Sequence, residues 1–399
     1  MVKNTQSPRI RFQRILVMIL DGFGVGALPD AAEYGDSGSN TLLNLAAAVG
    51  GIHLPNLERM GLGHICPFAG HDPSIQPIGA YGQLVEVSRG KDSTVGHWEL
   101  MGVIVNKPFP VYPQGFPDEV LDPFRQAIGT GILGNIPASG TEIIDQLGQE
   151  HVRTGFPIVY TSQDSVFQIA AHEEIIPVDR LYEICTLARA ILQGPHAVAR
   201  VIARPFIGNP GNWQRTRRRK DFSLEPPEPT LLDRLKEKGF AVIGIGKVVD
   251  IFANRGFTRQ IPAKGNADTL DKVEQTLSEL KKGFLLVNLV DFDMLYGHRN
   301  DPHGYAQALA SLDHRLESIL ASLHADDLLL ITADHGCDPV TPSTDHSREY
   351  TPILAFTPRA QKGINLGTRT SFSDVARTIA QNFCISELLR GVSFLDEIV

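Results

Sequence analysis

The chain has little cysteine, no long hydrophobic run and no excess of basic residues, and each shortage excludes a class of protein. Its four cysteines among 399 residues contain no CxxC pair, so neither a disulfide framework nor a thiolate zinc site is predicted. The apolar run at 15–20 is far shorter than the roughly 20 residues of a membrane helix, and Asp21-Gly22 follows it in place of a small-residue cleavage site. We therefore expect a cytoplasmic protein with no membrane partner.

The charge balance is acidic. The sequence holds 45 acidic and 37 basic residues, a formal net charge of -8, which argues against nucleic acid as the main partner. We also expect no obligate protein partner. A hydrophobic content of 42% and a charged content of 21% are ordinary for a soluble globular protein. The length favours two domains.

Short apolar runs bounded by polar or glycine-rich turns are typical of buried parallel strands. Helical patterns separate several of these runs, and the alternation predicts an α/β fold with a mostly parallel sheet between helices. The predicted strands are 15–20, 241–245, 284–290 and 328–332, and the predicted helices are 230–238, 268–281 and 305–325. Functional sites form at the carboxyl ends of such strands.

The middle third of the chain is richer in proline and glycine. It contains strand-like pieces and one helical pattern, at 158–160, 166–171, 198–204 and 178–192. We predict a core built from residues 1–105 and 222–399, with a smaller α+β substrate cap inserted at 106–221. The segment 208–227 is expected to lead back to the core.

Carboxylates and imidazoles follow three of the predicted strands. Each alone has an ordinary explanation, because Asp-Gly is usually a turn and a lone histidine is more often a core or surface residue than a ligand. Several at successive strand ends predict a two-metal centre with ions about 3.5–4 Å apart. The candidate ligands are Asp21, Asp293, His298, Asp334, His335 and His346.

A pair of hydroxyl residues, Ser93 and Thr94, follows the strand-like segment 81–87 and begins a helical pattern. Backbone N–H groups and the helix dipole favour phosphate at such a position. Simple N-capping would also explain the pair. Beside a metal, Thr94 is a candidate covalent phosphoryl acceptor. His97 is a candidate helper in proton transfer, with a structural role as the alternative.

Five segments, 21–30, 35–41, 93–99, 291–299 and 332–339, carry a combined pattern that includes Ser-Thr-x-Gly-His and Asp-His-Gly. The pattern resembles the phosphopentomutase family of the alkaline phosphatase superfamily, from the first strand to the C-terminal region. The Asp-His-Gly element is shared across the superfamily. The Ser-Thr-x-Gly-His motif and the long segment near the N-terminus resemble this branch in particular.

The resemblance implies an alkaline phosphatase-like core with two manganese ions. It places Asp21, Asp334 and His335 on one ion, Asp293, His298 and His346 on the other, and a phosphorylated Thr94 between them. It further implies interconversion of ribose 1-phosphate or 2-deoxyribose 1-phosphate with the 5-phosphate. A sugar bisphosphate, ribose 1,5-bisphosphate or glucose 1,6-bisphosphate, would be the activator. The related phosphoglycerate mutases use serine as nucleophile, so threonine favours the pentose enzymes.

The resemblance also implies residues that meet the pentose phosphate: Asp164, Arg200 and Arg215 in the cap and Lys247 in the core. Arginine forks suit a phosphate dianion, and a carboxylate accepts hydrogen bonds from ribose hydroxyls. Which arginine of the 215–219 run contacts phosphate stays open. The run 217–220 is interpreted as a solvated basic turn.

Two other functions use the same residues. A phosphatase or phosphodiesterase would share Thr94 and the ions but release phosphate to water. A catalytically silent protein would use the ions only to hold the fold, which predicts closed metal sites and no nucleophile. Thr94 argues against the silent protein, and the product, isomer or free phosphate, separates the two enzymes.

Overall fold

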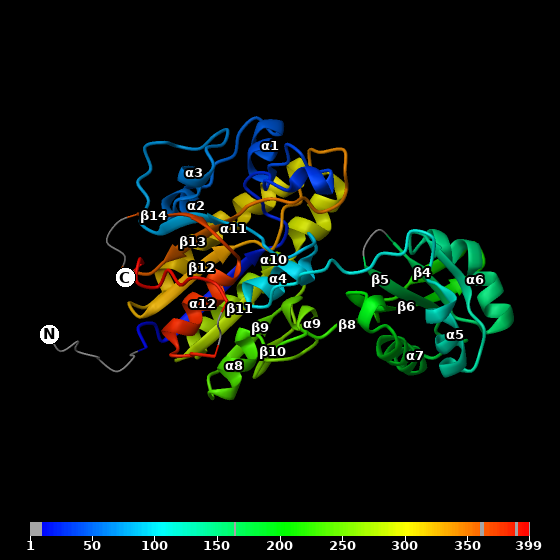
Figure 1. The fold of residues 1–399 in the computed structure, drawn as a ribbon. Coiled ribbons are helices and arrows are strands. Elements are labelled where there is room, and N and C mark those ends of the chain that lie inside the picture. Colours follow the sequence, from blue (N-terminus) through cyan, green and yellow to red (C-terminus); the bar gives the residue numbers. More distant parts are fainter. Residues whose placement is uncertain (1–9, 163–164, 360–362, 388–389, 399) are drawn as a thin grey trace. The chain divides into compact units, whose positions relative to one another are not determined.

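The computed structural model describes residues 10–162, 165–359, 363–387 and 390–398. The chain divides into two compact units (Figure 1), one made of Met1–Lys107 with Pro226–Val399 and the other of Pro108–Glu225. Among the described residues, no helix combines the length and apolar character that crossing a bilayer requires.

The first unit is built on a mostly parallel sheet, as predicted. Within its described residues eight strands follow the order β10-β9-β11-β1-β12-β13-β2-β14, and only β13 runs against the others. The strands are β1 (Arg14–Leu20), β2 (Ala80–Leu84), β9 (Val242–Ile245), β10 (Arg259–Ile261), β11 (Gly283–Leu289), β12 (Asp327–Thr332), β13 (Thr351–Phe356) and β14 (Ile364–Arg369).

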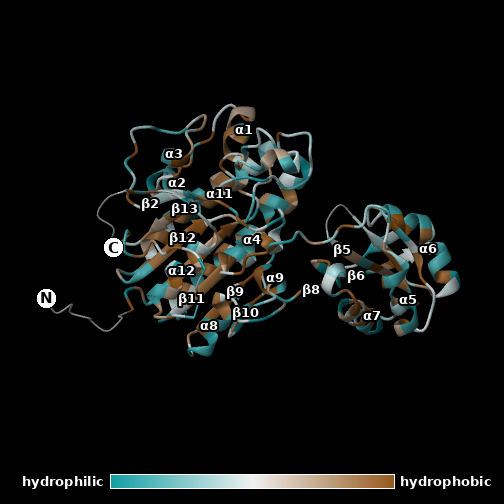
Figure 2. Ribbon diagram, viewed as in Figure 1, coloured by the Kyte–Doolittle hydropathy of each residue, from teal (hydrophilic) through white to brown (hydrophobic). Residues whose placement is uncertain are grey.

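Helices cover both faces of this sheet because its central strands are apolar on both sides. Leu16, Met18 and Leu20 of β1 pack with α1, α2, α10 and α11, whereas Ile15 and Val17 point the other way and are equally buried. The central strands β11 and β12 are accordingly hydrophobic over most of their length (Figure 2). Helix α4 contacts α9 and α12 and contributes no residue to the cluster around Leu16, Met18 and Leu20. It therefore lies on the other face of the sheet, toward which Ile15 and Val17 point.

Some helices of the first unit have a side-chain cap at the N-terminus. Thr230 and Asp233 form a reciprocal capping box at α8, and Asp301 caps α11 ahead of Pro302. The helices are α1 (Thr41–Ala48), α2 (Pro55–Met60), α3 (Leu62–Ile65), α4 (Ser93–Leu100), α8 (Leu231–Glu237), α9 (Val248–Ile251), α10 (Gly265–Glu279), α11 (Pro302–Ser322), α12 (Ser373–Asn382) and the 3-10 turn η1 (Ala31–Tyr34).

The second unit has a mixed sheet with α5 and α7 on one face and α6 on the other. Its described strands run β3-β4-β5-β6-β7, with β8 also paired to β6. The elements are α5 (Asp118–Ile128), β3 (Leu133–Pro137), α6 (Glu142–Thr154), β4 (Ile158–Thr161), β5 (Val166–His172), α7 (Val178–Ile191), η2 (Gly194–His196), β6 (Arg200–Asn209), β7 (Asn212–Arg215) and β8 (Lys220–Ser223).

The segment 208–227, expected to be a connection, is largely part of the second unit's sheet. Strand β7 forms a hairpin with β6, and β8 pairs with the start of β6 through Arg200 and Ser223. Trp213 packs with Phe206 under α6, which gives the hairpin an apolar anchor. Gly208 has φ +110, and a Cβ there would lie 2.2 Å from the Asn212 oxygen. The glycine and asparagine residues of this hairpin are equally typical of a linker, which is why the sequence predicted a connection here.

Candidate active site

The first group of site residues lies where two neighbouring parallel strands end. Asp21 follows β1, and Asp334 and His335 follow β12, whose Thr332 pairs with Ile19. His335 Nε2 lies 3.4 Å from Asp21 Oδ1 and 3.3 Å from Asp334 Oδ2. All three side chains are buried, and their donor atoms lie close enough together to hold one cation.

The second group follows β11, the neighbour of β1 on its other side. Asp293 lies in a π-helical turn, η3 (Phe292–Tyr296), and His298 in a 3-10 turn, η4 (Gly297–Arg299), where the sequence predicted a loop. Such π turns are frequent at functional sites. His298 Nε2 is 3.3 Å and His346 Nε2 is 3.4 Å from the Asp293 carboxylate. The groups adjoin, because the His335 and His346 rings are 3.9 Å apart.

Two of the histidines have their tautomers set by backbone carbonyls. His335 Nδ1 lies 2.9 Å from the Gly336 oxygen and His298 Nδ1 lies 2.7 Å from the Thr344 oxygen. Because a carbonyl only accepts, each Nδ1 carries a proton, and Nε2 is the ring nitrogen that faces the carboxylates. Nε2 of His298 and of His346 are 3.1 Å apart. A cation bound by both nitrogens would fit this arrangement.

Three buried carboxylate oxygens at the strand ends make no well-formed hydrogen bond to a described residue, although imidazole nitrogens lie 3.0–3.4 Å away: Asp21 Oδ1, Asp293 Oδ1 and Asp334 Oδ2. Burial opposes ionisation, but the nearby imidazoles of His346 and His298 hold the pKa of Asp293 well below its usual range. Burial is likewise outweighed by His335 and His97, which lower the pKa of Asp334. Ionised oxygens without partners are costly to bury unless a metal binds them. Carboxylates with imidazoles therefore fit divalent cations here.

Helix α4 presents its first turn to the first group. Gly96 allows this approach, because a Cβ there would lie 2.0 Å from the Asp334 carbonyl oxygen. Asp92 caps the helix and accepts the N–H groups of Thr94 and Val95. Ser93 Oγ lies 3.2 Å from His335 Nε2. Thr94 is 4% exposed, and its hydroxyl makes no hydrogen bond to the described part of the chain.

Two residues that contact the candidate ligands, His97 and Asn288, were not predicted from the sequence to orient them. His97 Nδ1 lies 3.0 Å from Asp334 Oδ2, and the Asn288 amide lies 2.9 Å from His97 Nε2 and donates to Asp21 at 3.1 Å. His97 is completely buried, which favours the structural role over proton transfer. Asn288 interrupts the apolar strand β11, and that polar residue in an apolar run is the signal that could have found it.

The predicted substrate residues fall in both units. Lys247, in the first unit, donates to Asp21 Oδ2 at 3.0 Å and to Ser93 Oγ at 3.3 Å. In the second unit Arg200 begins β6, with Nη1 3.6 Å from Asp221, and Arg215 ends β7 with its side chain exposed. Asp164 lies outside the described residues.

The basic run after Arg215 makes defined contacts. Arg219 forms two bonds of 2.7 Å to Asp221, and the Lys220 ammonium lies 4.9 Å from the centre of the Tyr182 ring. All four residues of the run 217–220 are exposed, in keeping with a solvated turn, although Lys220 begins β8 and Arg219 is paired with Asp221. Asp221, half-buried beside Arg200 and Arg219, is the counter-ion that the sequence did not reveal.

Comparison with known proteins agrees with this geometry. The model of the Metalloenzyme superfamily matches residues 13–387. Phosphopentomutase of Acetivibrio thermocellus is 57% identical over 387 residues, covering 97% of this chain and 100% of that protein. Phosphopentomutase of Dictyoglomus turgidum is 55% identical over 386 residues, covering 97% and 98%.

Among solved structures, the PH0037 protein from Pyrococcus horikoshii covers 95% of this chain and 100% of its own at TM-score 0.50 and 15% identity, a likeness of fold alone. The match to the metalloenzyme superfamily is in keeping with the carboxylates of Asp21, Asp293 and Asp334, which fit divalent cations. The phosphopentomutases named above are more than half identical to this chain over nearly the full length of both proteins. The chain therefore belongs to the phosphopentomutase family and is an intramolecular phosphotransferase.

Proposed function

We propose that the chain interconverts the 1- and 5-phosphates of ribose and 2-deoxyribose through a phosphothreonine at Thr94. The observation that carries this proposal is the set of buried oxygens of Asp21, Asp293 and Asp334 that make no well-formed hydrogen bond, together with the contact between the start of α4 and His335 through Ser93 Oγ. Thr94, the next residue of that helix start, is proposed to accept and return the phosphoryl group.

The two groups of side chains are proposed to hold two manganese ions. Asp21, Asp334 and His335 would bind one ion, and Asp293, His298 and His346 the other. When bound, such a pair neutralises charge on a transferring phosphoryl group and lowers the pKa of an adjacent hydroxyl. Behind them, Asn288 and His97 keep the carboxylates in place.

The chemical step is proposed to begin with Thr94 phosphorylated by a sugar bisphosphate, ribose 1,5-bisphosphate or glucose 1,6-bisphosphate. The bond between phosphorus and Thr94 Oγ1 breaks while a new bond forms to the free hydroxyl of a pentose monophosphate. That hydroxyl releases its proton, and Oγ1 regains one. The resulting bisphosphate then returns its other phosphoryl group to Thr94, which completes the isomerisation.

Substrate recognition is assigned to Lys247 of the first unit and to Asp164, Arg200 and Arg215 of an inserted cap. Both arginines lie in the sheet of the second unit, where Arg200 begins β6 and Arg215 pairs with Phe206 of the same strand. Guanidinium groups suit the phosphate that is not reacting. The proposal keeps the cytoplasm as location and includes no nucleic-acid, membrane or obligate protein partner.

The test is mass spectrometry of the manganese-loaded protein after incubation with labelled ribose 1,5-bisphosphate. Thr94→Val keeps the shape of the side chain without its oxygen, so it should take up no phosphate and show no mutase activity. Ser93→Ala is the matched variant, because Ser93 Oγ is the neighbouring hydroxyl at the same cluster; it should still be labelled on Thr94. Phosphate on Ser93, or undiminished activity of Thr94→Val, would contradict the proposal.

The same incubation separates the mutase from a hydrolase. With ribose 1-phosphate as substrate, the wild-type protein should accumulate ribose 5-phosphate and little inorganic phosphate. Predominant release of inorganic phosphate would show that water, and not a sugar hydroxyl, is the acceptor.

A further inference from the structure

One of the scattered cysteines lies inside the candidate metal centre. The donor atoms of Cys337, Asp293 and His298 all lie within 4.8 Å of one another. Cys337 is 1% exposed, and it follows His335 by two positions in the loop after β12. The spacing of the cysteines along the chain carried no sign of this arrangement.

Two glycines make room for Cys337 beside the carboxylate. A Cβ on Gly297 would lie 2.5 Å from the Cys337 sulfur, and a Cβ on Gly22 would lie 2.8 Å from the Cys337 Cβ and 3.4 Å from the Asp293 Cβ. Only residues without side chains allow the loops after β1, β11 and β12 to close this tightly around the thiol. The fold therefore holds the sulfur in place.

The atom that points to a ligand is Asp293 Oδ1. Asp293 is 3% exposed, and this oxygen makes no well-formed hydrogen bond to a described residue, although His346 Nε2 lies 3.4 Å away. A carboxylate oxygen, an imidazole nitrogen and a sulfur converging within ligand distance form a mixed donor set, which thiophilic divalent ions prefer to carboxylates and imidazoles alone. Asp293 could therefore share a cation either with His298 and His346 or with His298 and Cys337.

We propose that Cys337 serves as a sulfur ligand when the second group takes up a thiophilic ion such as zinc or cadmium, through Asp293, His298 and Cys337. This inference rests on the proposed two-ion function of the same residues. On binding, the sulfur–hydrogen bond breaks, the proton passes to solvent, and the thiolate electron pair binds the ion. Manganese, a harder ion, is held by Asp293, His298 and His346 without sulfur. The centre therefore selects zinc and cadmium over manganese more strongly than its carboxylates and histidines would.

The experiment uses the full chain with Cys384→Ser, because Cys384 is the exposed thiol and would bind metal nonspecifically. The ion-free protein is titrated with cobalt and then with cadmium, and sulfur-to-metal charge-transfer absorption is recorded alongside the bound ion content. Cys337→Ser should abolish this absorption. The matched control Cys66→Ser, which removes another buried thiol, should retain it.

Competition measurements quantify the selectivity. Because the loss of even an outer partner of a metal ligand costs about 10–100-fold in affinity, Cys337→Ser should lower the cadmium-to-manganese affinity ratio at least about tenfold. Cys66→Ser should leave this ratio unchanged. A ratio equal in both variants would overturn the proposal.

X-ray absorption on the cadmium-loaded Cys384→Ser protein tests the ligand without any change at Cys337. A sulfur neighbour is expected, and a shell of only oxygen and nitrogen would overturn this inference even if Cys337→Ser failed to fold. Ions that bind without sulfur leave the proposed mutase function intact. A protein that takes up no cobalt, cadmium or manganese at all would overturn both proposals.

Discussion

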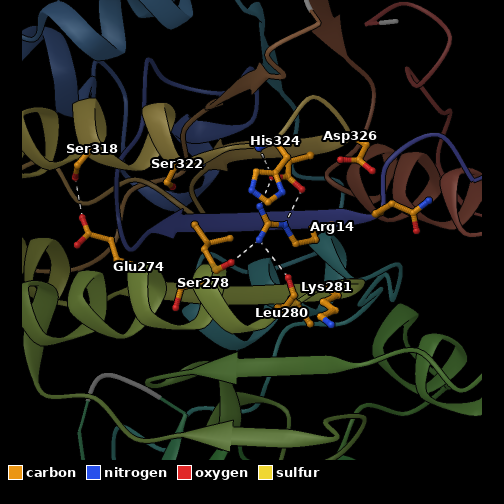
Figure 3. A pocket seen from close by; sticks show the side chains of 12 residues that line it. Arg14, Glu274, Ser278, Leu280, Lys281, Ser318, Ser322, His324 and Asp326 are labelled. Atoms are coloured by element: carbon orange, nitrogen blue, oxygen red, sulfur yellow. Dashed lines mark hydrogen bonds and ion pairs between the residues drawn. The ribbon is translucent and has the colours of Figure 1, made fainter.

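The two ends of the core sheet both gather histidine and aspartate, yet they differ in how these groups are satisfied. At the carboxyl ends of β1 and β12 lie Asp21, Asp334 and His335. At the amino ends a cavity of about 690 Å³ is lined by residues that include Arg14, His324, Asp326 and Asp327 (Figure 3). Both clusters have donor atoms close enough for a metal, so proximity alone does not distinguish them.

At the amino end the two buried charges, Arg14 and Asp327, are paired with each other. Arg14 donates two hydrogen bonds to the Asp327 carboxylate, one of them 2.7 Å, and also donates to the carbonyl oxygens of Leu277 and Leu280 at the end of α10 (Figure 3). Asp327 also accepts the backbone N–H of His324 at 2.6 Å. Arg14 thus satisfies carbonyls that α10 leaves open and neutralises the carboxylate. This cluster stabilises the fold.

At the carboxyl end, by contrast, Asp21, Asp293 and Asp334 each keep a buried oxygen that faces imidazole nitrogens but makes no well-formed hydrogen bond to a described residue. A charged cluster that is internally complete has no need of a ligand, whereas an incomplete one does. The difference predicts that changes at the carboxyl end affect ion binding and catalysis, and that changes at the amino end affect stability.

The largest effect is expected from Asp334→Asn. Losing one ligand charge should cost several kcal/mol of transition-state stabilisation, so mutase activity should fall about 10³-fold or more. Elemental analysis should show loss of ion from the Asp21, Asp334 and His335 group. Asp313→Asn is the control, because Asp313 is a buried carboxylate whose oxygens accept the N–H groups of Leu57 and Asn56; it should keep both ion content and activity. Full ion content in Asp334→Asn would remove Asp334 from the centre.

The mirror experiment at the amino end is Arg14→Met. Removing the guanidinium leaves the buried Asp327 charge uncompensated, which should lower the free energy of unfolding by about 3–5 kcal/mol. Activity per folded molecule should not change. The double variant Arg14→Met/Asp327→Leu should recover most of the loss, as measured by denaturant unfolding. A double variant as unstable as the single one would show that the ion pair is not what Arg14 contributes.

A pH effect is expected from Glu349, which backs the carboxyl-end loops and accepts bonds from the Thr41 N–H and hydroxyl. Burial raises the pKa of Glu349 to about 7. A glutamate in the unfolded chain titrates near pH 4.3. Between about pH 4.5 and 7 the folded protein therefore keeps a proton on Glu349 that the unfolded chain has lost. The free energy of unfolding should fall by up to about 3 kcal/mol as the pH rises through this range. Unfolding of ion-free protein at several pH values is the measurement. Parallel pH profiles for wild type and Glu349→Gln would contradict this assignment.

The smallest effect is expected behind the ligands. His97→Gln should weaken ion binding at the first group by about 10–100-fold while sparing the second group, because His97 orients Asp334. His151→Gln is the matched control, since His151 is also fully buried and hydrogen-bonded, to Phe156. Titration calorimetry with manganese should resolve the two sites. Equal weakening at both groups would indicate general loosening of the fold.

Much of the fold was predictable because its signals are local. The apolar run of β1, for example, predicted a strand that is confirmed at Arg14–Leu20, and the strand-to-helix alternation predicted the mostly parallel sheet. The segment 208–227 was not predictable in the same way. Its glycines and asparagine suit a linker and a hairpin equally, and pairing with β6 decided between them.

The site was predictable in part for a related reason. Parallel neighbouring strands bring their carboxyl ends together, so Asp21, Asp293 and Asp334 could be expected at one edge once their strands were recognised. The sequence alone therefore predicted strands that correspond to β1, β2, β9, β11 and β12, and six candidate donors near strand ends. The partners of each polar group come from segments hundreds of residues apart, such as Arg14 with Asp327. Only the tertiary structure showed in which cluster the buried charges are paired, that Cys337 lies beside Asp293, and which side chains His97 and Asn288 contact. The reason is that a hydrogen bond requires two groups to be close in space, whatever their separation in the sequence.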